Sequence, residues 1–414
     1  MGNKNVLIIG GGTAGLSAAV ELVKLDIHVD LVEKSDFLGG HAIGYTCKAI
    51  GNTCVKCGAC MVEEKLNHTI LNPKIKIWTG SRVRAVSKNG RFTAKIDGRP
   101  KYIDPDKCTN CRICFDRCPV PGGILQGYSP NNIPFYAINP EKCRYLKDKS
   151  CGICREECPE TAINLDATSA EYTREADAVL VAAGFQPFNP EDKPYGYHRF
   201  HNVVTSLDLE RMLKKAGRVK KPGDNAVPGR IAFIQCVGSR DSKRNHLWCS
   251  KVCCASAMRM ARRIKDRQPE IDITVFYMDV QTFGKDFEQF YKDAREDLRM
   301  VRAIPGDIYE VEEQNLKMNV LDNTTHETLE EIFDLVVLSI GITPGKDNGE
   351  LSELLHLKHA GSGFIESGDK TASATNTGIF TAGTVRGAMS IPETIASAGS
   401  AVRQIAKYLR PNQS

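Results

Sequence analysis

The chain has 414 residues, of which 42% are hydrophobic and 25% charged, and a formal net charge of +5. This composition is that of an ordinary globular protein, and the length suggests about two or three domains of roughly 100–200 residues each. No apolar stretch approaches the roughly 20 residues of a membrane span, no signal peptide precedes the first predicted strand, and no basic run is dense enough to suggest nucleic acid.

The first segment predicts the strand–helix–strand unit of a dinucleotide-binding fold. The run Asn5–Ile9 predicts a buried strand, an apolar helix extends to Leu25, and a second strand over His28–Val32 ends at Glu33. An acidic residue about 20 positions after the glycines can accept hydrogen bonds from a ribose. Because strand, helix, second strand and acid follow in this order, we predict a dinucleotide site here.

The fingerprint itself lies between the first strand and the helix, and it consists of Gly10, Gly11, Gly12, Thr13, Ala14 and Gly15. Gly10 allows the tight turn, Gly12 lets a pyrophosphate approach the backbone, and Gly15 lets the helix and the strand pack closely. The phosphates are then expected at the positive end of the helix.

Three further segments favour FAD over NAD. Glu33 is followed by Lys34 and, a few residues later, by Gly39, Gly40 and His41. Flavoproteins of the thioredoxin-reductase type place small residues near the flavin at this point of the sequence. A strand from residue 178 ends in a small-residue turn at Ala183 and Gly184. Near the C-terminus, Gly383 and Thr384 resemble a Gly-Asp pair that holds the ribityl chain, and Ile391 begins the final helix. The aspartate of that pair is a threonine here, which keeps a hydroxyl but weakens the expected contact.

Eight cysteines between residues 108 and 158 have the spacing of a ferredoxin with two [4Fe–4S] clusters. The first run is Cys108, Cys111, Cys114 and Cys118, and the second is Cys143, Cys151, Cys154 and Cys158. In such motifs the fourth cysteine of each run ligates the other cluster. We therefore predict one cluster on Cys108, Cys111, Cys114 and Cys158, and the other on Cys143, Cys151, Cys154 and Cys118. Zinc is the alternative, but the Cys-Pro ends and the exchanged cysteines argue against it.

A second nucleotide-like domain is predicted after a linker at 222–228. Its expected elements are a strand over 229–235, a helix over 255–265, and strands over 272–278 and 334–339. Where an NAD(P)H-binding domain would carry another glycine fingerprint, this chain has Cys236, Cys249, Cys253 and Cys254. These cysteines predict either a third [4Fe–4S] centre or a buried or redox-active cysteine pair.

The motif Gln235-Cys236-Val237-Gly238-Ser239-Arg240, followed by Cys249, Cys253 and Cys254, resembles the HdrA family, the flavin-containing component of heterodisulfide reductases. The resemblance covers nearly the whole chain. It implies that these four cysteines bind a [4Fe–4S] cluster beside the FAD, and it extends to the segment 283–288, in which Lys285 either lines the flavin cleft or caps a turn.

Within this family the chain looks most like the corresponding component of the quinone-interacting membrane-bound oxidoreductase of sulfate reducers. That resemblance implies a complex that links menaquinol to adenylylsulfate reductase. Its other members would be a sister flavin and iron–sulfur protein and a membrane cytochrome and iron–sulfur protein. The expected location is cytoplasmic, on the inner face of the cell membrane through these partners. The alternative is a hub of a soluble electron-transfer or electron-bifurcating complex with hydrogenase, formate or NADH partners.

Four further cysteines, Cys47, Cys54, Cys57 and Cys60, have the spacing C-x6-C-x2-C-x2-C. Longer members of the family have cysteines that match Cys54 and Cys57, and the set here would complete a fourth cluster locally. The alternative is free thiols on a loop or a redox-active pair. Arg259 follows the cysteine pair on a predicted helix and faces either a cofactor or solvent; the resemblance implies lysine near this position in bifurcating members.

The sequence thus predicts an α/β fold, a two-domain FAD flavoprotein of thioredoxin-reductase type with an inserted 2[4Fe–4S] ferredoxin domain. The predicted segments are the FAD domain at 1–101, 167–224 and 346–414, the ferredoxin insert at 102–166, and the second nucleotide-like domain at 225–345. No residue is predicted to act as a catalytic acid or base. Two rival functions are a self-contained NAD(P)H-dependent oxidoreductase and a scaffold with an inert flavin.

Overall fold

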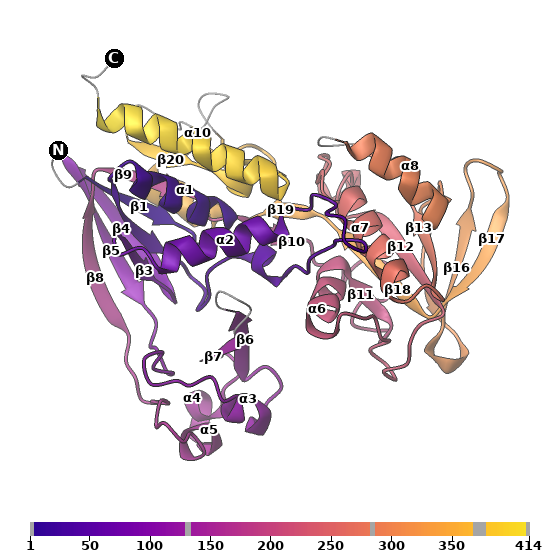
Figure 1. The fold of residues 1–414 in the computed structure, drawn as a ribbon, viewed down its shortest axis with the longest axis horizontal. Helices are drawn as coiled ribbons and strands as arrows, with labels where there is room; N and C mark the ends of the chain where they lie inside the picture. The colour runs from indigo at the N-terminus through magenta and orange to yellow at the C-terminus, as the bar shows by residue number, and fades with distance from the viewer. Residues whose placement is uncertain (1–3, 129–133, 282–285, 367–377, 411–414) are drawn as a thin grey trace.

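The computed structural model describes residues 4–128, 134–281, 286–366 and 378–410. Figure 1 shows two α/β domains side by side, with a small body that projects from the first of them. The first domain is built from both ends of the chain, since the indigo N-terminal and yellow C-terminal segments lie together. Segment 283–285, with Lys285, lies outside the described residues.

The core of the first domain is a parallel sheet of five strands in the order β20-β9-β1-β2-β3. The strands are β1 (Asn5–Ile9), β2 (His28–Val32), β3 (Ile75–Trp78), β9 (Ala178–Val181) and β20 (Ile379–Thr381). The bounds of β1 and β2 are those that the sequence predicts. Their apolar runs suit strands that are covered on both faces.

Helices cover one face of this sheet and a second sheet covers the other. The helices are α1 (Thr13–Lys24), α2 (Ala59–Ile70) and α10 (Ile391–Leu409), and all three contribute to one apolar cluster with the sheet. The opposite face packs on the antiparallel sheet β4-β5-β8, formed by β4 (Ser81–Asn89), β5 (Arg91–Gly98) and β8 (Ala170–Ala176). Also in this domain are η1 (His41–Gly44), α9 (Asn348–Leu355) and η5 (Gly383–Arg386).

The small body is inserted between β5 and β8. It contains the hairpin β6 (Ile124–Tyr128) and β7 (Pro134–Ile138) and the short helices α3 (Ile113–Arg117), α4 (Arg144–Asp148) and α5 (Ile153–Glu156). Its apolar residues form a cluster of their own, to which several of the predicted ligand cysteines belong. The ends of the insert are drawn together by a bridge between Ile103 and Ile163 and by the pairing of Gly98 with Ala170.

The second domain is a five-stranded parallel sheet in the order β11-β18-β12-β13-β14. Its strands are β11 (Val203–Thr205), β12 (Arg230–Val237), β13 (Asp272–Phe276), β14 (Arg299–Val301) and β18 (Leu335–Ile340). Helices α6 (Ser206–Ala216), α7 (Cys253–Arg267) and α8 (Phe287–Asp297) cover one face. The other face packs on a small sheet of β15 (Tyr309–Glu310), β16 (Leu316–Leu321) and β17 (Thr328–Phe333). The domain also contains the short helices η3 (Ser242–Arg244) and η4 (Glu312–Gln314).

The predicted boundary at residue 225 is displaced in the structure. Strand β11 pairs with β18 in the second sheet, and α6 packs on the same sheet, so β11 and α6, which lie before residue 225, belong to the second domain. The two domains are joined where β10 (Phe185–Pro187) and β19 (Ile342–Pro344) pair in antiparallel fashion. The turn-rich run at 222–228 is therefore a loop within the second domain, because the earlier strand lies beside one more than 130 residues later in the chain.

Candidate functional site

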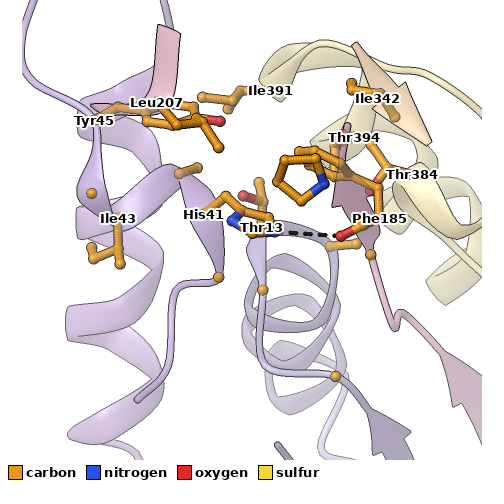
Figure 2. Close-up of a pocket in the computed structure, with 18 of the residues that line it drawn as sticks. Thr13, His41, Ile43, Tyr45, Phe185, Leu207, Ile342, Thr384, Ile391 and Thr394 are labelled. Carbon is orange, nitrogen blue, oxygen red and sulfur yellow. Dashed lines mark hydrogen bonds between the residues drawn. The ribbon is translucent and has the colours of Figure 1, made fainter. Parts of the chain in front are cut away.

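A cavity of about 1240 Å³ lies at the carboxyl ends of the strands of the first sheet and extends to the second domain. It is lined by twelve of the predicted cofactor residues, namely Gly10, Gly12, Thr13, Ala14, Glu33, Lys34, Gly40, His41, Ala183, Gly184, Thr384 and Ile391. Figure 2 shows side chains from η1, β10, α6, β19 and the C-terminal segment around this shared space. The carboxyl edge of a parallel sheet is where ligands bind in folds of this kind.

The three other predicted residues do not line the cavity but shape it. A Cβ on Gly15 would lie 1.9 Å from the Gly10 carbonyl oxygen, so helix α1 can approach β1 only without a side chain there. Gly383 has a φ of +75°, and a Cβ on it would lie 2.7 Å from that of Ala14. Gly39 has a φ of +98° and packs against Ile43. These glycines therefore allow close packing around the site.

The space at Gly12 differs, and it fits a pyrophosphate. A Cβ on Gly12 would find its nearest neighbour, the Gly40 Cα, 3.9 Å away. Gly12 is also the N-cap of α1 and has no side-chain cap, so the first amides of the helix face the cavity. Amides at a helix N-terminus bind phosphate oxygens, and a glycine lets the phosphate reach them.

Glu33 is buried at the end of β2, and its carboxylate already accepts two backbone hydrogen bonds. The amides of Gly11 and Ser35 donate to it at 2.7 and 2.8 Å. These bonds fix the carboxylate beside the glycine turn. Since an ionised carboxylate has about four acceptor positions, capacity remains for ribose hydroxyls.

His41, which the sequence places near the flavin, makes a structural contact. Its Nε2 lies 3.3 Å from the Phe185 carbonyl oxygen and the two rings are 4.8 Å apart (Figure 2). Desolvation lowers the pKa of His41, so the ring is neutral near pH 7. It therefore ties η1 to β10 across the mouth of the cavity.

The second domain supplies a wall of the cavity that sequence reasoning missed. Lys48 and Glu210 are both buried there, with 2.5 Å between Nζ and Oε1, and both line the cavity. The Thr46 amide donates to the other oxygen of Glu210 at 3.2 Å. Burial raises the pKa of Tyr45 beside them. No motif could have indicated this pair, because its members are 162 positions apart.

In the ferredoxin insert, one predicted set of four cysteines surrounds a small cavity. Cys108, Cys111, Cys114 and Cys158 all line it. Burial, followed by the nearby thiols of Cys108, Cys154 and Cys111, raises the pKa of Cys114 to about 12. The fourth member comes from the second run, as the exchanged pattern requires.

The second predicted set also comes together. Burial, followed by the nearby thiols of Cys143, Cys118 and Cys151, raises the pKa of Cys154 to about 11. Cys154 is in turn a neighbour of Cys114, so the two sets lie side by side. Two clusters held on these sets would therefore lie side by side in one small body.

The third set is assembled by a bulge and a helix start. Strand β12 shifts register against β18 between Ile234 and Val237, and Cys236 within this bulge has a φ of +60°. Bulges of this kind re-aim side chains beside active sites. Cys253 and Cys254 form the first turn of α7, which begins two residues earlier than the sequence predicts. Burial and then the thiols of Cys254 and Cys249 raise the pKa of Cys236, to about 12.

Cys47, Cys54 and Cys57 of the fourth set lie on the loop before α2, Cys60 lies in the first turn of α2, and the loop contacts the second domain. Burial and the thiols of Cys57, Cys54 and Cys47 raise the pKa of Cys60, so the four side chains are neighbours. Arg259 of α7 donates from Nε to the Val55 carbonyl oxygen at 3.0 Å and lines the cavity, which places it beside this loop and not in bulk solvent.

Across the ranges that the structure describes, no group of three or more His, Cys, Asp and Glu side chains is arranged around a single metal position. Within the same ranges, no helix combines the length and apolar character needed to span a membrane.

Comparison with known proteins gives the class and then the family. Residues 8–61 match a model described as an NAD(P)-binding Rossmann-like domain, and residues 101–121 match a 4Fe-4S binding domain. The structure of thioredoxin reductase from T. acidophilum aligns over 99% of both chains with a TM-score of 0.54 and 16% identity. The fold is therefore that of a thioredoxin-reductase-like α/β protein, as predicted, with an iron–sulfur domain.

Two curated relatives resemble nearly the whole chain, and both are the HdrA component of a heterodisulfide reductase. That of the H2:CoB–CoM heterodisulfide,ferredoxin reductase of Methanothermobacter thermautotrophicus is 33% identical over 97% of this chain and 63% of its own length. That of the CoB–CoM heterodisulfide reductase of Methanocaldococcus jannaschii is 34% identical over 97% of this chain and 64% of its own length. Over nearly its whole length the chain is therefore homologous to the corresponding part of the HdrA component of heterodisulfide reductases, of which it spans less than two thirds.

Proposed function

We propose that this chain is an electron-transfer subunit that binds FAD in the large cavity and four-iron clusters on its cysteine sets. The observation that carries the proposal is that one cavity is reached by three cysteine-bearing parts of the molecule. Cys253 of the third set and Cys57 of the fourth line it, and so do Gln126 and Gly127 of the ferredoxin insert. A flavin in this cavity would lie beside Cys57 of the fourth set and Cys253 of the third, and the ferredoxin insert would reach it through β6.

FAD exchanges electrons in pairs or singly, whereas each cluster accepts one, so together they join two-electron and one-electron partners. The residues of the chain would bind and orient these groups. The amide end of α1 would hold the pyrophosphate, and Glu33 the ribose. The capping box of Ser390 and Glu393 fixes the start of α10 at the cavity wall.

The structure offers little support for the rival NAD(P)H-dependent enzyme. The end of β12 is bulged, and a loop with a cysteine leads from it to α7. A second phosphate-binding turn would need glycines at the start of that helix. Helix α7 begins with two cysteines instead. Failure of NADH and NADPH to bleach the bound flavin is the expected result.

We further propose the finer role that the motifs suggest, a relay between menaquinol, through a membrane partner, and adenylylsulfate reductase. Its support is the family resemblance together with Arg259, since the resemblance implies lysine near this position in bifurcating members. In that role the chain lies on the inner face of the cell membrane with its partner proteins.

The alternative is a hub of a soluble complex with hydrogenase, formate or NADH partners. What favours it is the name of the Methanothermobacter relative, which includes H2 and ferredoxin. The chain spans less than two thirds of that relative, so its partners do not carry over directly.

The experiment is an anaerobic purification from native membranes, with iron, flavin and co-purifying proteins quantified together. We expect FAD that menaquinol reduces, a co-purifying membrane protein, and at least about 12 iron atoms per chain from three clusters of four. Co-purification with hydrogenase, formate dehydrogenase or an NADH-oxidising partner would instead establish the soluble hub. About 16 iron atoms would include the set of Cys47, Cys54, Cys57 and Cys60.

A further inference from the structure

Gln235 is a buried side chain with no bonding partner for either end of its amide. It is 2% exposed, and neither its Nε2 nor its Oε1 finds a hydrogen-bond partner among the residues that the structure describes. The hydroxyl of Ser339, which is 1% exposed, also has no hydrogen-bond partner among the described residues. A buried polar group left without a partner costs about 1–3 kcal/mol, so such groups usually mark a missing ligand or water.

The two residues lie opposite one another at the carboxyl ends of adjacent strands. Ile234 pairs with Leu338 and Val237 with Ile340, so Gln235 and the bulged Cys236 both oppose Ser339. Both unpaired groups thus sit at the carboxyl edge of the sheet, where the strands of such folds receive their ligands.

Alternation along the strands shows which face of the sheet these side chains join. Ile231 and Phe233 of β12 belong to the apolar cluster that α7 covers, as do Leu335 and Val337 of β18. Because side chains two residues apart share a face, Gln235 and Ser339 continue these rows toward the first turn of α7. That turn consists of Cys253 and Cys254.

Contacts at this end of the sheet agree with the placement. The thiol of Cys253 lies 3.6 Å from the carbonyl oxygen of Ile340, the neighbour of Ser339. Cys253 and Ser339 also line the same cavity. Gln235 therefore lies in the neighbourhood of the third cysteine set, directly before its first member in the sequence.

We infer that the Gln235 side chain donates a hydrogen bond from Nε2 to a sulfur of the cluster held by Cys236, Cys249, Cys253 and Cys254, and so raises its reduction potential. This inference rests on the proposed function. Hydrogen bonds to cluster sulfurs help to set the potential, and a donor favours the reduced, more negative state. The amide oxygen is left to accept a hydrogen bond from the Ser339 hydroxyl, which would satisfy both groups.

The test is an anaerobic redox titration of the loaded protein followed by electron paramagnetic resonance. The signal of the third centre is first identified as the one that Cys249→Ala removes, together with about four iron atoms. In Gln235→Leu we expect the midpoint potential of that signal to fall by the equivalent of about a tenfold change in equilibrium constant, roughly 59 mV for one electron. The flavin and the other clusters should keep their potentials. An unchanged potential would overturn the inference.

Gln268→Leu is the matched control. Gln268 is also buried, at the other end of α7, but its amide is bonded at both ends to the backbone of Val219, at 2.7 and 3.3 Å. Its replacement should lower the free energy of unfolding and leave every potential unchanged. A potential shift in this variant as large as in Gln235→Leu would show a general packing effect and would overturn the inference as well.

A second measurement uses the wild-type chain, in case Gln235→Leu does not load its third cluster. With ¹⁵N in the side-chain amides of glutamine, pulsed resonance should detect a nitrogen coupled to the third centre, and its absence would contradict the inference. If Cys249→Ala removes neither iron nor signal, the proposed third cluster itself is wrong. The two failures are therefore distinguishable.

Discussion

The glycines of the first turn have different tasks, which their surroundings separate. Gly15 is closed in by the Gly10 carbonyl oxygen, 1.9 Å from where a Cβ would be, whereas the space at Gly12 is open to 3.9 Å. A side chain at position 15 would therefore disturb the packing of helix α1 on β1. A side chain at position 12 would instead fill space that a ligand can occupy. This division agrees with the separate tasks that the sequence motif predicts for Gly12 and Gly15.

We predict that Gly12→Val folds but does not bind flavin. Its side chain would occupy the space where the pyrophosphate is expected, so flavin content should fall at least about tenfold, a change of about 1.4 kcal/mol in binding. Flavin released by denaturation is measured by fluorescence, beside the thermal unfolding of the flavin-free chain. Gly15→Val is the contrasting variant and should destabilise the flavin-free chain itself. Normal flavin content in Gly12→Val would contradict the assignment of this site.

At the scale of elements, a buried carboxylate joins three strands of the second domain. Glu331 of β17 is paired with Arg230 of β12 and Arg299 of β14, each at 2.6 Å. Burial alone would raise the pKa of Glu331, but hydrogen bonds from Arg299 and Arg230 outweigh it and lower the pKa. The small sheet is thereby fixed to the edge of the large one.

Glu331→Gln should reduce the free energy of unfolding by about 1–2 kcal/mol at pH 7. This loss is smaller than for a fully buried ion pair, because solvent screens the two half-exposed arginines. A depressed carboxyl pKa stabilises the fold above the unfolded value of 4.5, and this contribution is lost as the pH falls through the folded pKa. The difference between wild type and variant should therefore be constant from about pH 5.5 to 8 and narrow below about 4.5.

Urea unfolding across this pH range measures the difference. The control is Glu330→Gln on the same strand, because Glu330 is 60% exposed and pairs with Lys317 at 2.9 Å. It should cost less than about 0.5 kcal/mol. A difference between wild type and Glu331→Gln that widens at acid pH would contradict the sign of the pKa shift.

At the scale of the whole molecule, the segment from η1 to the cysteine loop connects the two domains. Besides the pair of Lys48 and Glu210, Asp266 of α7 accepts from the Gly51 amide at 3.1 Å, and Arg263 donates to the Ala49 carbonyl oxygen at 3.0 Å. These bonds hold both walls of the flavin cavity in one arrangement, which a relay between fixed cofactors needs.

Lys48→Met should lower the free energy of unfolding by about 3–5 kcal/mol, because it leaves the Glu210 carboxylate buried without its cation. The double variant with Glu210→Leu should recover much of this loss. Chemical denaturation measures both, with Lys24→Met as control, since the pair of Lys24 and Glu21 is exposed and should contribute less than about 1 kcal/mol. No recovery in the double variant would show that the two side chains act independently.

The ferredoxin insert should be removable as a unit. Gly98 and Ala170 are paired at its base, so an Asn-Gly turn between them would close β5 and β8 into a hairpin. We expect a folded chain that has lost about eight iron atoms, from two clusters, and that still binds flavin. Affinity for flavin should fall, because Gln126 and Gly127 line the cavity. Loss of the third centre's signal as well would contradict an independent insert.

The sequence by itself determined those features that are encoded by spacing over a few residues. The order of strand, glycines, helix and acid predicted the bounds of β1 and β2. The cysteine runs predicted the four side chains, Cys158 among them, that surround the small cavity of the ferredoxin insert. Such motifs are readable because a local backbone conformation requires particular residues at fixed distances in the chain.

Only the tertiary structure decided which distant residues meet. It placed β11 in the second domain, buried Lys48 against Glu210, and laid the loop of the fourth cysteine set on Arg259. It also left the Gln235 amide without a partner, among the described residues, beside the third set. These arrangements depend on packing between the surfaces of separate elements. No local sequence pattern records them, because the partner of each of these groups lies more than a hundred residues away in the chain or is not part of the chain.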